Sequence, residues 1–413
     1  MWLVLDVVSS GPAVGDAMRL SPILSFTSAS QRMTPTTALD IAQALIRLPS
    51  VNSNYDPASA DEGAVTQWIE DWGRAHGFNV WRQAVLPNRE NILLQFRNGA
   101  DHPHLMLNGH TDTVGVGGMS IPPFNGEMQN GRLWGRGASD MKGPLACMLA
   151  AALILKNALS TWRGTLTVAC MVDEEFRFRG VTAMLEQMIP PDFAVVGEPT
   201  RLRVVRGCKG CLRFAVHAVG LAAHSSKPHE GRSAIVAMAQ GILELERHFT
   251  TRLTQITSPD FGTSTGSIGL ICGGTGVNSV PERCTIQVDI RLLPGQDWRA
   301  TYQEMQTLLS ERCRQVTDVQ WQFDEPSVVD PSFELPAEHP LVQTACRVMG
   351  QAVPDVVFFS CDASKIAARR VPVIVLGPGD IAQAHTMDEF IAVTDLEAGT
   401  AAYVRLAQAL MPG

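Results

Sequence analysis

The sequence predicts an α/β fold in which helices flank a mostly parallel sheet and a smaller α+β domain is inserted into the chain. The chain has 413 residues, which is too long for one ordinary core, so two domains are expected. Short apolar, β-rich runs alternate with helical patterns in the first half and return near the C-terminus. Between these parts, the pattern changes to pairs of strands followed by single helices.

Residues 1–34 have weak periodicity and many Ser, Pro and Gly residues, so we expect a poorly ordered N-terminal extension. The apolar run at residues 2–5 has no basic flank and is too short to span a membrane. Translation from Met33 is a hypothesis that mass spectrometry of the natively expressed N-terminus would test. Regular helical patterning begins only after Thr37.

The segments 35–204 and 321–413 are predicted to form one domain. Strands alternating with helices imply a mostly parallel sheet that is covered on both faces. The predicted strands are Asn91–Phe96, His104–Asn108, Thr165–Val172, Phe193–Val196 and Val371–Leu376, and the predicted helices include Lys142–Leu159 and Pro340–Met349.

Residues 205–320 are predicted to form the inserted domain. Their β-β-α-β-β-α order resembles a ferredoxin-like sandwich. Two strands are expected within Leu202–Gly220, two more at Gly266–Gly273 and Arg283–Leu292, and helices at Ser233–Thr250 and Trp298–Thr317.

The composition limits the function classes. The formal net charge is −8, and no basic cluster is interleaved with aromatic residues, which argues against nucleic-acid and anionic-membrane partners. The nine cysteines are an odd number and are spread along the chain, as in a cytoplasmic protein with reduced thiols. We therefore expect a cytoplasmic protein whose partner is a small molecule.

Five groups of acidic and histidine residues are predicted to follow strands, where α/β sheets bind their ligands. Asp112 comes two residues after His110, which suits a metal ligand and the residue that orients it. These groups lie at Leu107–Asp112, Gly135–Gly143, Asp173–Glu175, Gly197–Thr200 and Gln383–Glu389.

Two histidines and three carboxylates in these groups suit a pair of divalent metal ions. Imidazole together with carboxylate favours Zn²⁺, with Co²⁺ or Mn²⁺ as alternatives. Two such ions, about 3.5–4 Å apart, can polarise an amide carbonyl and acidify a water molecule. Of the adjacent Glu174 and Glu175, one can bind metal while the other carries the proton of that water.

Each residue also has an ordinary structural explanation. Asp140 could cap the helix that follows it, and Glu174 with Glu175 could form a solvated loop. His110 could be a hydrogen-bonded core histidine. Five such groups in one chain favour the interpretation that they together form one metal site.

These motifs resemble the dinuclear zinc peptidase and deacylase family that includes acetylornithine deacetylase and succinyl-diaminopimelate desuccinylase. The resemblance covers about residues 36–410 and implies a zinc-exopeptidase-like fold and a metallohydrolase acting on linear amides. It implies Glu174 as general base and Asp112 as the residue that orients His110. The implied metal ligands are His110 and Glu198 on one ion, Glu175 and His385 on the other, and Asp140 bridging both.

The resemblance also implies that the inserted domain is a lid and a dimerisation surface, and hence a homodimer. His224, in the stretch Ala223–Pro228, would reach the reaction centre, from the same or the partner subunit, and stabilise the oxyanion. A substrate carboxylate needs a cation or an amide nearby, and the candidates are Lys209, Asn278 and Arg291. A strand ion pair for Arg291 and a plain turn for Asn278 are the alternatives.

Within the family, His110–Val114 and Gln383–Glu389 look most like the motifs of acetylornithine deacetylases, which act in arginine biosynthesis. The stretch Ser360–Ala363 departs from the G-T-E-A-like sequence usual in those enzymes, close to where the substrate side chain is expected. The resemblance therefore implies hydrolysis of a small N-acyl amino acid, and N-acetylornithine is the substrate that it favours. Desuccinylase, carboxypeptidase, dipeptidase or aminoacylase activity is the alternative, and a non-catalytic binding protein is a remote one.

Overall fold

The computed structural model describes residues 34–312 and 318–413. Pro35–Gly413 forms one compact unit, which is the part described below. The predicted N-terminal extension, including Met33, lies outside the described residues except for Thr34. The last five residues of the helix predicted at Trp298–Thr317 lie outside them as well.

Among the described residues, nine strands form the main sheet, in the order β1-β2-β6-β3-β7-β20-β8-β18, with β19 paired to β8. The central strands β6, β3, β7 and β20 are parallel, and antiparallel strands complete both edges, so the predicted α/β class with a mostly parallel sheet is confirmed. The strands are β1 Asn79–Leu86, β2 Arg89–Asn98, β3 His104–His110, β6 Gly164–Met171, β7 Phe193–Val196, β8 Val205–Cys208, β18 Phe333–Glu334, β19 Asp355–Val357 and β20 Val373–Val375.

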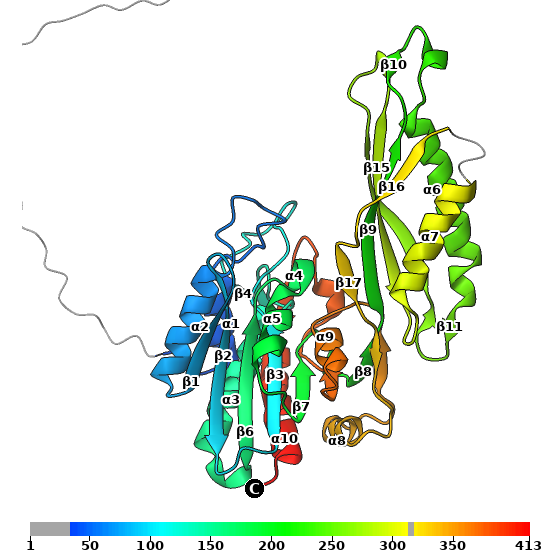
Figure 1. Ribbon diagram of the computed structural model, residues 1–413. Coiled ribbons are helices and arrows are strands. Elements are labelled where there is room, and N and C mark those ends of the chain that lie inside the picture. Colours follow the sequence, from blue (N-terminus) through cyan, green and yellow to red (C-terminus); the bar gives the residue numbers. More distant parts are fainter. Residues whose placement is uncertain (1–33, 313–317) are drawn as a thin grey trace, which may run out of the picture. The chain divides into compact units, whose positions relative to one another are not determined.

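Helices cover both faces of this sheet, as Figure 1 shows, because its central strands are apolar on both sides. Leu105 and Leu107 of β3 pack in one core, and Met106 between them packs in the other. The first core includes α1 Ala38–Ile46, α2 Gly63–Ala75, α3 Lys142–Asn157, α8 Pro340–Met349 and α10 Val393–Leu410, and the second includes α5 Arg179–Gln187 and α9 Ala363–Ala368.

A second, antiparallel sheet carries two helices on one face (Figure 1). Its order is β13-β15-β9-β16, with β17 also paired to β9. Along the chain, this gives a β-α-β-β-α-β ferredoxin-like arrangement with a core of its own. The elements are β9 Gly210–Val219, α6 Ala234–Thr251, β13 Thr265–Gly273, β15 Arg283–Leu292, α7 Trp298–Arg312, β16 Gln320–Phe323 and β17 Val328–Asp330.

The strand pairing corrects the predicted limits of the inserted domain, 205 and 320. β8 belongs to the main sheet, while β16 and β17, which follow residue 320, belong to the second sheet. The predicted β-β-α-β-β-α order was therefore shifted by one strand. Residues 205–219 form an almost unbroken β-rich run, and only the choice of pairing partner shows that its two strands belong to different sheets. The division into a catalytic domain and a lid stays a prediction.

The remaining strands are short. A three-stranded sheet joins residues that are far apart in the sequence in the order β21-β5-β4. Within the described residues, no helix has the length and apolar character needed to cross a membrane. These strands are β4 Glu127–Gln129, β5 Arg132–Trp134, β21 Phe390–Ala392, β10 Ala223–His224, β14 Ser279–Val280, β11 Thr257–Ser258 and β12 Gly262–Thr263, and the short helix α4 spans Glu174–Arg177.

Candidate metal centre

Three of the five predicted groups lie at neighbouring strand ends of the main sheet. His110 is the last residue of β3, Glu174 and Glu175 begin α4 just after β6, and Glu198 follows β7. Because β6, β3 and β7 are parallel neighbours, their carboxyl ends meet at one edge of the sheet. The order of the strands therefore brings these side chains together.

The other two groups do not directly follow strands of the main sheet, although the segment that carries Asp140 begins just after β5. Asp140 lies just before α3, and His385 lies in a loop between β20 and β21, with a left-handed backbone (φ 61°). Antiparallel pairing of β5 with β21 joins their two segments, with Phe390 opposite Trp134. A small separate sheet thus carries these two side chains to the same edge.

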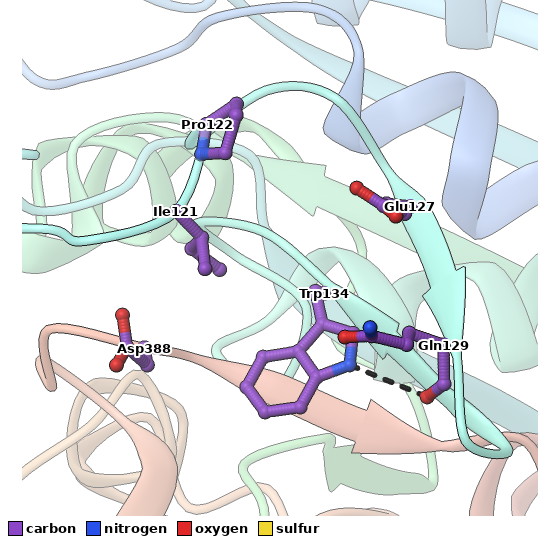
Figure 2. A pocket seen from close by; sticks show the side chains of 6 residues that line it. All are labelled: Ile121, Pro122, Glu127, Gln129, Trp134 and Asp388. Carbon is purple, nitrogen blue, oxygen red and sulfur yellow. Dashed lines mark hydrogen bonds between the residues drawn. The ribbon is translucent and has the colours of Figure 1, made fainter.

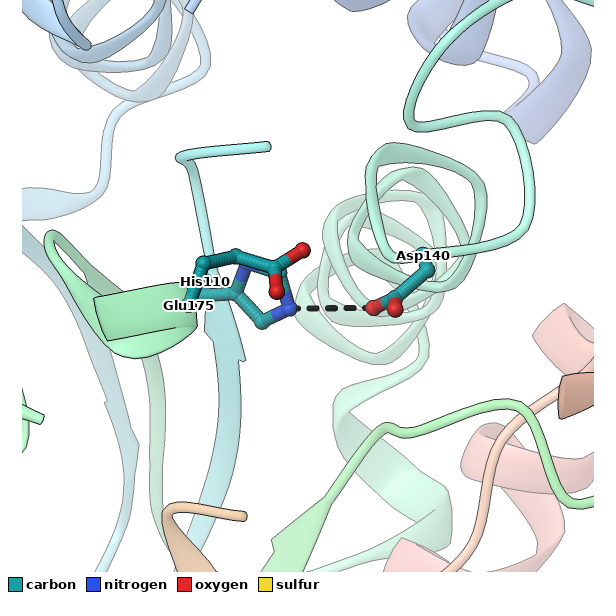
Figure 3. A group of neighbouring side chains, drawn as sticks. All are labelled: His110, Asp140 and Glu175. Atoms are coloured by element: carbon teal, nitrogen blue, oxygen red, sulfur yellow. Dashed lines mark hydrogen bonds and ion pairs between the residues drawn. The ribbon is translucent and has the colours of Figure 1, made fainter. Parts of the chain in front are cut away.

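His110, Asp140 and Glu175 form a group whose candidate ligand atoms all lie within 4.8 Å of one another (Figure 3). Asp140 Oδ1 lies 3.1 Å from His110 Nε2, and its Oδ2 lies 3.4 Å from His385 Nε2. His385 Nε2 is also 3.1 Å from Glu175 Oε2. One carboxylate with its two oxygens toward two different imidazoles has the arrangement that a bridging ligand needs.

The buried carboxylates of this group need positive charge. One oxygen of Glu175 and one of Glu198 are buried without a hydrogen-bond partner in the described chain. Burial and the nearby Asp140 raise the pKa of Glu175 to about 7 and that of Glu198 well above its usual value. Divalent cations would supply the missing partners and oppose these shifts, so the donor set fits a metal site.

The carboxylate of Asp112 holds the segment that carries the two glutamates. Its oxygens accept the backbone N–H groups of Glu174 and Glu175 at 3.1 and 3.2 Å. The side chain of Asn52 donates to the same carboxylate at 2.9 Å. The nearest acceptor for His110 Nδ1 is instead the backbone carbonyl of Asp112, at 3.0 Å, with the carboxylate at 3.5 Å. Asp112 therefore positions the glutamates at least as directly as it orients His110.

Glu389 holds the segment that carries Asp140 in a similar way. Its carboxylate accepts the backbone N–H groups of Gly137, Ser139 and Asp140 at 3.0, 2.8 and 2.9 Å. Arg136 donates to Glu389 at 2.8 Å and to the carbonyl of Thr386, next to His385, at 3.1 Å. Glu389 and Arg136 thus join the Asp140 segment to the His385 segment.

Glu174 lies beside the candidate ligands without hydrogen bonds to them. Its Oε2 is 4.0 Å from His110 Nε2, and only 9% of its side chain is exposed. Burial raises its pKa well above the usual value, and negative charge on Glu198 acts in the same direction. A carboxylate whose pKa is raised toward the working pH is suited to accept and return a proton.

Sequence reasoning missed several polar residues around this group. Tyr55 donates to the carbonyl of Glu175 at 2.9 Å. Asn108 and Asp362 are buried, and the polar atoms of both side chains have no hydrogen-bond partner among the described residues. Burial raises the pKa of Asp362 to about 7. Asn108 could have been found from the sequence, since it comes two residues before His110 on the same strand and alternate residues of a strand share a face.

The candidates in the predicted lid fall into two places. His224 and Asn278 are neighbours, because His224 pairs with Ser279 and the N–H of Ser225 donates to the carbonyl of Asn278 at 3.0 Å. Both are exposed, and within the described chain no hydrogen bond or ion pair joins them to the metal group. Arg291 lies on β15 of the second sheet and pairs with Asp289, while Lys209 lies between β8 and β9 and donates to the carbonyl of Thr263.

A separate surface pocket lies beside the three-stranded sheet. Figure 2 shows it lined by Ile121, Pro122, Glu127, Gln129, Trp134 and Asp388. None of the predicted site residues lines it. Asp388 accepts the hydroxyl of Ser120 at 2.6 Å, which ties this loop to the segment that carries His385.

Comparison with known proteins identifies close counterparts. A family model described as peptidase family M20/M25/M40 matches residues 106–409. An acetylornithine deacetylase of Proteus mirabilis (strain HI4320) is 31% identical over 373 residues, which is 87% of this chain and 93% of that protein.

Two solved structures share the fold. A tripeptidase of Staphylococcus aureus has a TM-score of 0.73 at 20% identity, and the match covers 90% of this chain and 97% of that one. A dinuclear metal-binding peptidase of Bacillus subtilis has a TM-score of 0.67 at 15% identity, covering 91% and 97%. These two likenesses establish the fold.

Proposed function

This chain belongs to peptidase family M20/M25/M40, an enzyme family that hydrolyses amide bonds, and we propose that it removes the acyl group from a small N-acyl amino acid, first of all N-acetylornithine. The observation that carries the proposal is the buried group of His110, Asp140 and Glu175 with Glu174 beside it. Its relatives named acetylornithine deacetylase support the choice of substrate.

We propose that His110, Asp140, Glu175, Glu198 and His385 hold two divalent cations, with Zn²⁺ as the first choice. Bound there, the cations would polarise the amide carbonyl and acidify a water molecule. The Bacillus subtilis peptidase of the same fold binds two metals, which supports the number. Bound cations also require neutral imidazoles, and would therefore displace the proton that Asp112 and Asp140 otherwise favour on buried His110.

Glu174 is the proton carrier in this proposal. Its carboxylate takes a proton from the attacking water and returns it to the leaving amine nitrogen, which gives the free amino acid and the carboxylic acid. Asp112 keeps Glu174 and Glu175 in place through their backbone N–H groups. His224 is proposed to stabilise the oxyanion that develops on the carbonyl oxygen.

A substrate panel tests the proposal directly. The full chain, reconstituted with Zn²⁺, is assayed on N-acetylornithine, succinyl-diaminopimelate and dipeptides at equal concentrations. We expect the highest kcat/KM on N-acetylornithine. A preference for dipeptides would instead assign peptidase activity to the chain. This is the main alternative, because peptidases are among the solved structures that share its fold. No hydrolysis of any member would contradict the proposal.

We also propose that two copies associate through the second sheet. β13 is an edge strand of that sheet, and Leu270 and Ile271 on it are 62% and 59% exposed. Val236 and Leu243 of α6 are 58% and 66% exposed. An exposed apolar edge strand favours pairing with another copy. Light scattering should give a dimer for the wild type and a monomer for Leu270→Asp, and a wild-type monomer would contradict the proposal.

A cytoplasmic location and a role in arginine biosynthesis complete the proposal. They follow from the proposed substrate and from the cysteine content. Complementation of an arginine-requiring strain that lacks acetylornithine deacetylase tests the role.

A further inference from the structure

The turn between β6 and the short helix α4 is held by side chains from distant parts of the chain. This matters because N–H groups at the start of a helix have no acceptor within that helix. Four consecutive N–H groups, those of residues 172–175, instead donate to side-chain oxygens at 3.0–3.2 Å. The pairs are Val172 with Asn91, Asp173 with Glu62, and both Glu174 and Glu175 with Asp112. The backbone of this turn is therefore fixed residue by residue.

Asp173, in the middle of this turn, has a left-handed backbone with a φ of 63°. Few residues with a Cβ atom adopt this conformation, and those that do are kept in it by surrounding contacts. The carboxylate of Asp173 accepts hydrogen bonds from Asn52 at 3.0 Å and from Arg179 at 2.9 Å. Contacts from other segments, rather than local sequence preference, thus set the direction in which the chain enters α4.

Glu62 forms a buried ion pair with Arg89 while it accepts the N–H of Asp173. Arg89 donates to the two carboxylate oxygens of Glu62 through Nε and Nη2, at 2.6 Å each. The exposed fractions of the two side chains are 0% for Glu62 and 4% for Arg89. Nη2 of Arg89 also lies 3.3 Å from Asp173 Oδ1, so the pair contacts both the N–H and the carboxylate of that residue.

The ion pair is better suited to positioning than to stabilising the fold. Taking two charges out of water costs about as much free energy as their attraction returns, so a buried pair adds little stability over apolar side chains of similar size. Two parallel hydrogen bonds do fix the guanidinium and the carboxylate in one plane. Because Glu62 precedes α2 and Arg89 begins β2, the pair also ties the turn to two elements of the first core.

We propose that Glu62 and Arg89 are positioning residues for the metal centre. They hold the turn at Asp173, and this turn sets where the carboxylates of Glu174 and Glu175 lie relative to the other candidate ligands. The proposal rests on the proposed function, which gives Glu174 its role as proton carrier and Glu175 its role as ligand. Loss of the pair should therefore weaken metal binding and slow turnover without a substitution at any proposed ligand.

Metal affinity tests the proposal without a substrate. In Glu62→Gln, the amide cannot accept all three hydrogen bonds from Arg89 and the N–H of Asp173, so the turn loses part of its support. Chelator competition should give a dissociation constant for the more weakly held Zn²⁺ about 10–100-fold above that of the wild type. With N-acetylornithine as substrate, kcat should fall by a similar factor while KM changes little.

Arg89→Lys is the second variant. It keeps the buried charges balanced, so it should fold even if Glu62→Gln does not, but an ammonium group cannot make the two parallel hydrogen bonds. The dissociation constant for Zn²⁺ should therefore rise, by a smaller factor than in Glu62→Gln. Wild-type metal affinity in the folded variants would overturn the proposal.

Asp330→Asn is the matched control, because Asp330 is also fully buried and pairs with Lys365 at 3.1 Å. Urea unfolding should show lower stability for this variant, with metal affinity unchanged. An equal loss of metal affinity in Asp330→Asn and Glu62→Gln would assign the effect to lost stability and overturn the proposal. A substrate panel without hydrolysis, together with weakened metal binding in Glu62→Gln, would count against the proposed function alone.

Discussion

The metal centre on the main sheet and the charged face on the second sheet, which carries Arg213, Asp289 and Arg291 on the paired strands β9 and β15, hold their ionisable groups differently. In the metal centre, side-chain exposure is 1% for His110 and 9% for Glu174. On the charged face, exposure is 42% for Arg213 and 28% for Arg291. The buried group has an excess of negative charge, and the exposed face has an excess of positive charge.

The difference in burial predicts how strongly each region responds to change. Charges interact more strongly where water is excluded, and backbone hydrogen bonds from Asp112 and Glu389 fix the buried carboxylates. On the charged face, water and salt screen the arginines, and one carboxylate orients both. Substitutions in the metal centre should therefore cost activity or metal affinity, whereas those on the charged face should have smaller effects.

The largest effect is expected from Glu174→Gln. Without a group to carry the proton, kcat should fall by about 10²–10⁴-fold. Bound metal, measured by elemental analysis, should stay at the wild-type amount because Glu174 is not a proposed ligand. Glu246→Gln, on the exposed side of α6, is the control and should keep full activity. A fully active Glu174→Gln protein would show that the base is another residue.

His224→Ala tests whether an exposed residue can matter as much as a buried one. If His224 stabilises the oxyanion, kcat should fall by about 10²–10³-fold, with metal content and KM little changed. His229→Ala removes a second exposed histidine from the same region and should have no effect. Normal turnover in His224→Ala would leave the second sheet with a role in assembly alone.

Glu389→Gln should lower metal affinity without touching a ligand. A glutamine cannot accept the three backbone N–H groups and the Arg136 guanidinium together, so the Asp140 and His385 segments lose their common anchor. The dissociation constant, from chelator competition, should rise by about 10–100-fold. Asp330→Asn, which also removes a buried charge, should lower stability but leave metal affinity unchanged. Equal metal affinities in the two variants would show that Glu389 does not anchor the metal centre.

The smallest effect on activity concerns Lys142, a fully buried cation that donates to the carbonyl of Leu48 at 2.7 Å. Burial lowers its pKa from 10.5 to about 7, so between these values the unfolded chain binds more protons than the folded one. Stability should therefore rise with pH in this range, by up to about 1.4 kcal/mol per pH unit. Urea unfolding at pH 7 and pH 9 should show this increment in the wild type and its absence in Lys142→Met. The same pH dependence in both proteins would mean that Lys142 is not the source.

The sequence by itself determined the elements and much of the site. Apolar β-rich runs such as Phe193–Val196 became buried strands because their pattern is local. His110, Glu174 and Glu198 could be placed together because His110 ends a strand, the other two follow strands closely, and parallel neighbouring strands end at one edge.

The tertiary structure decided what depends on residues far apart in the chain. β8 joined the main sheet rather than the second one, and Glu389 came to hold the backbone of Asp140, 249 residues earlier. Arg213, Asp289 and Arg291 became a charged face only when β9 paired with β15 in one register. Strand partners and long-range hydrogen bonds depend on how distant segments pack, so local periodicity and motif spacing do not encode them.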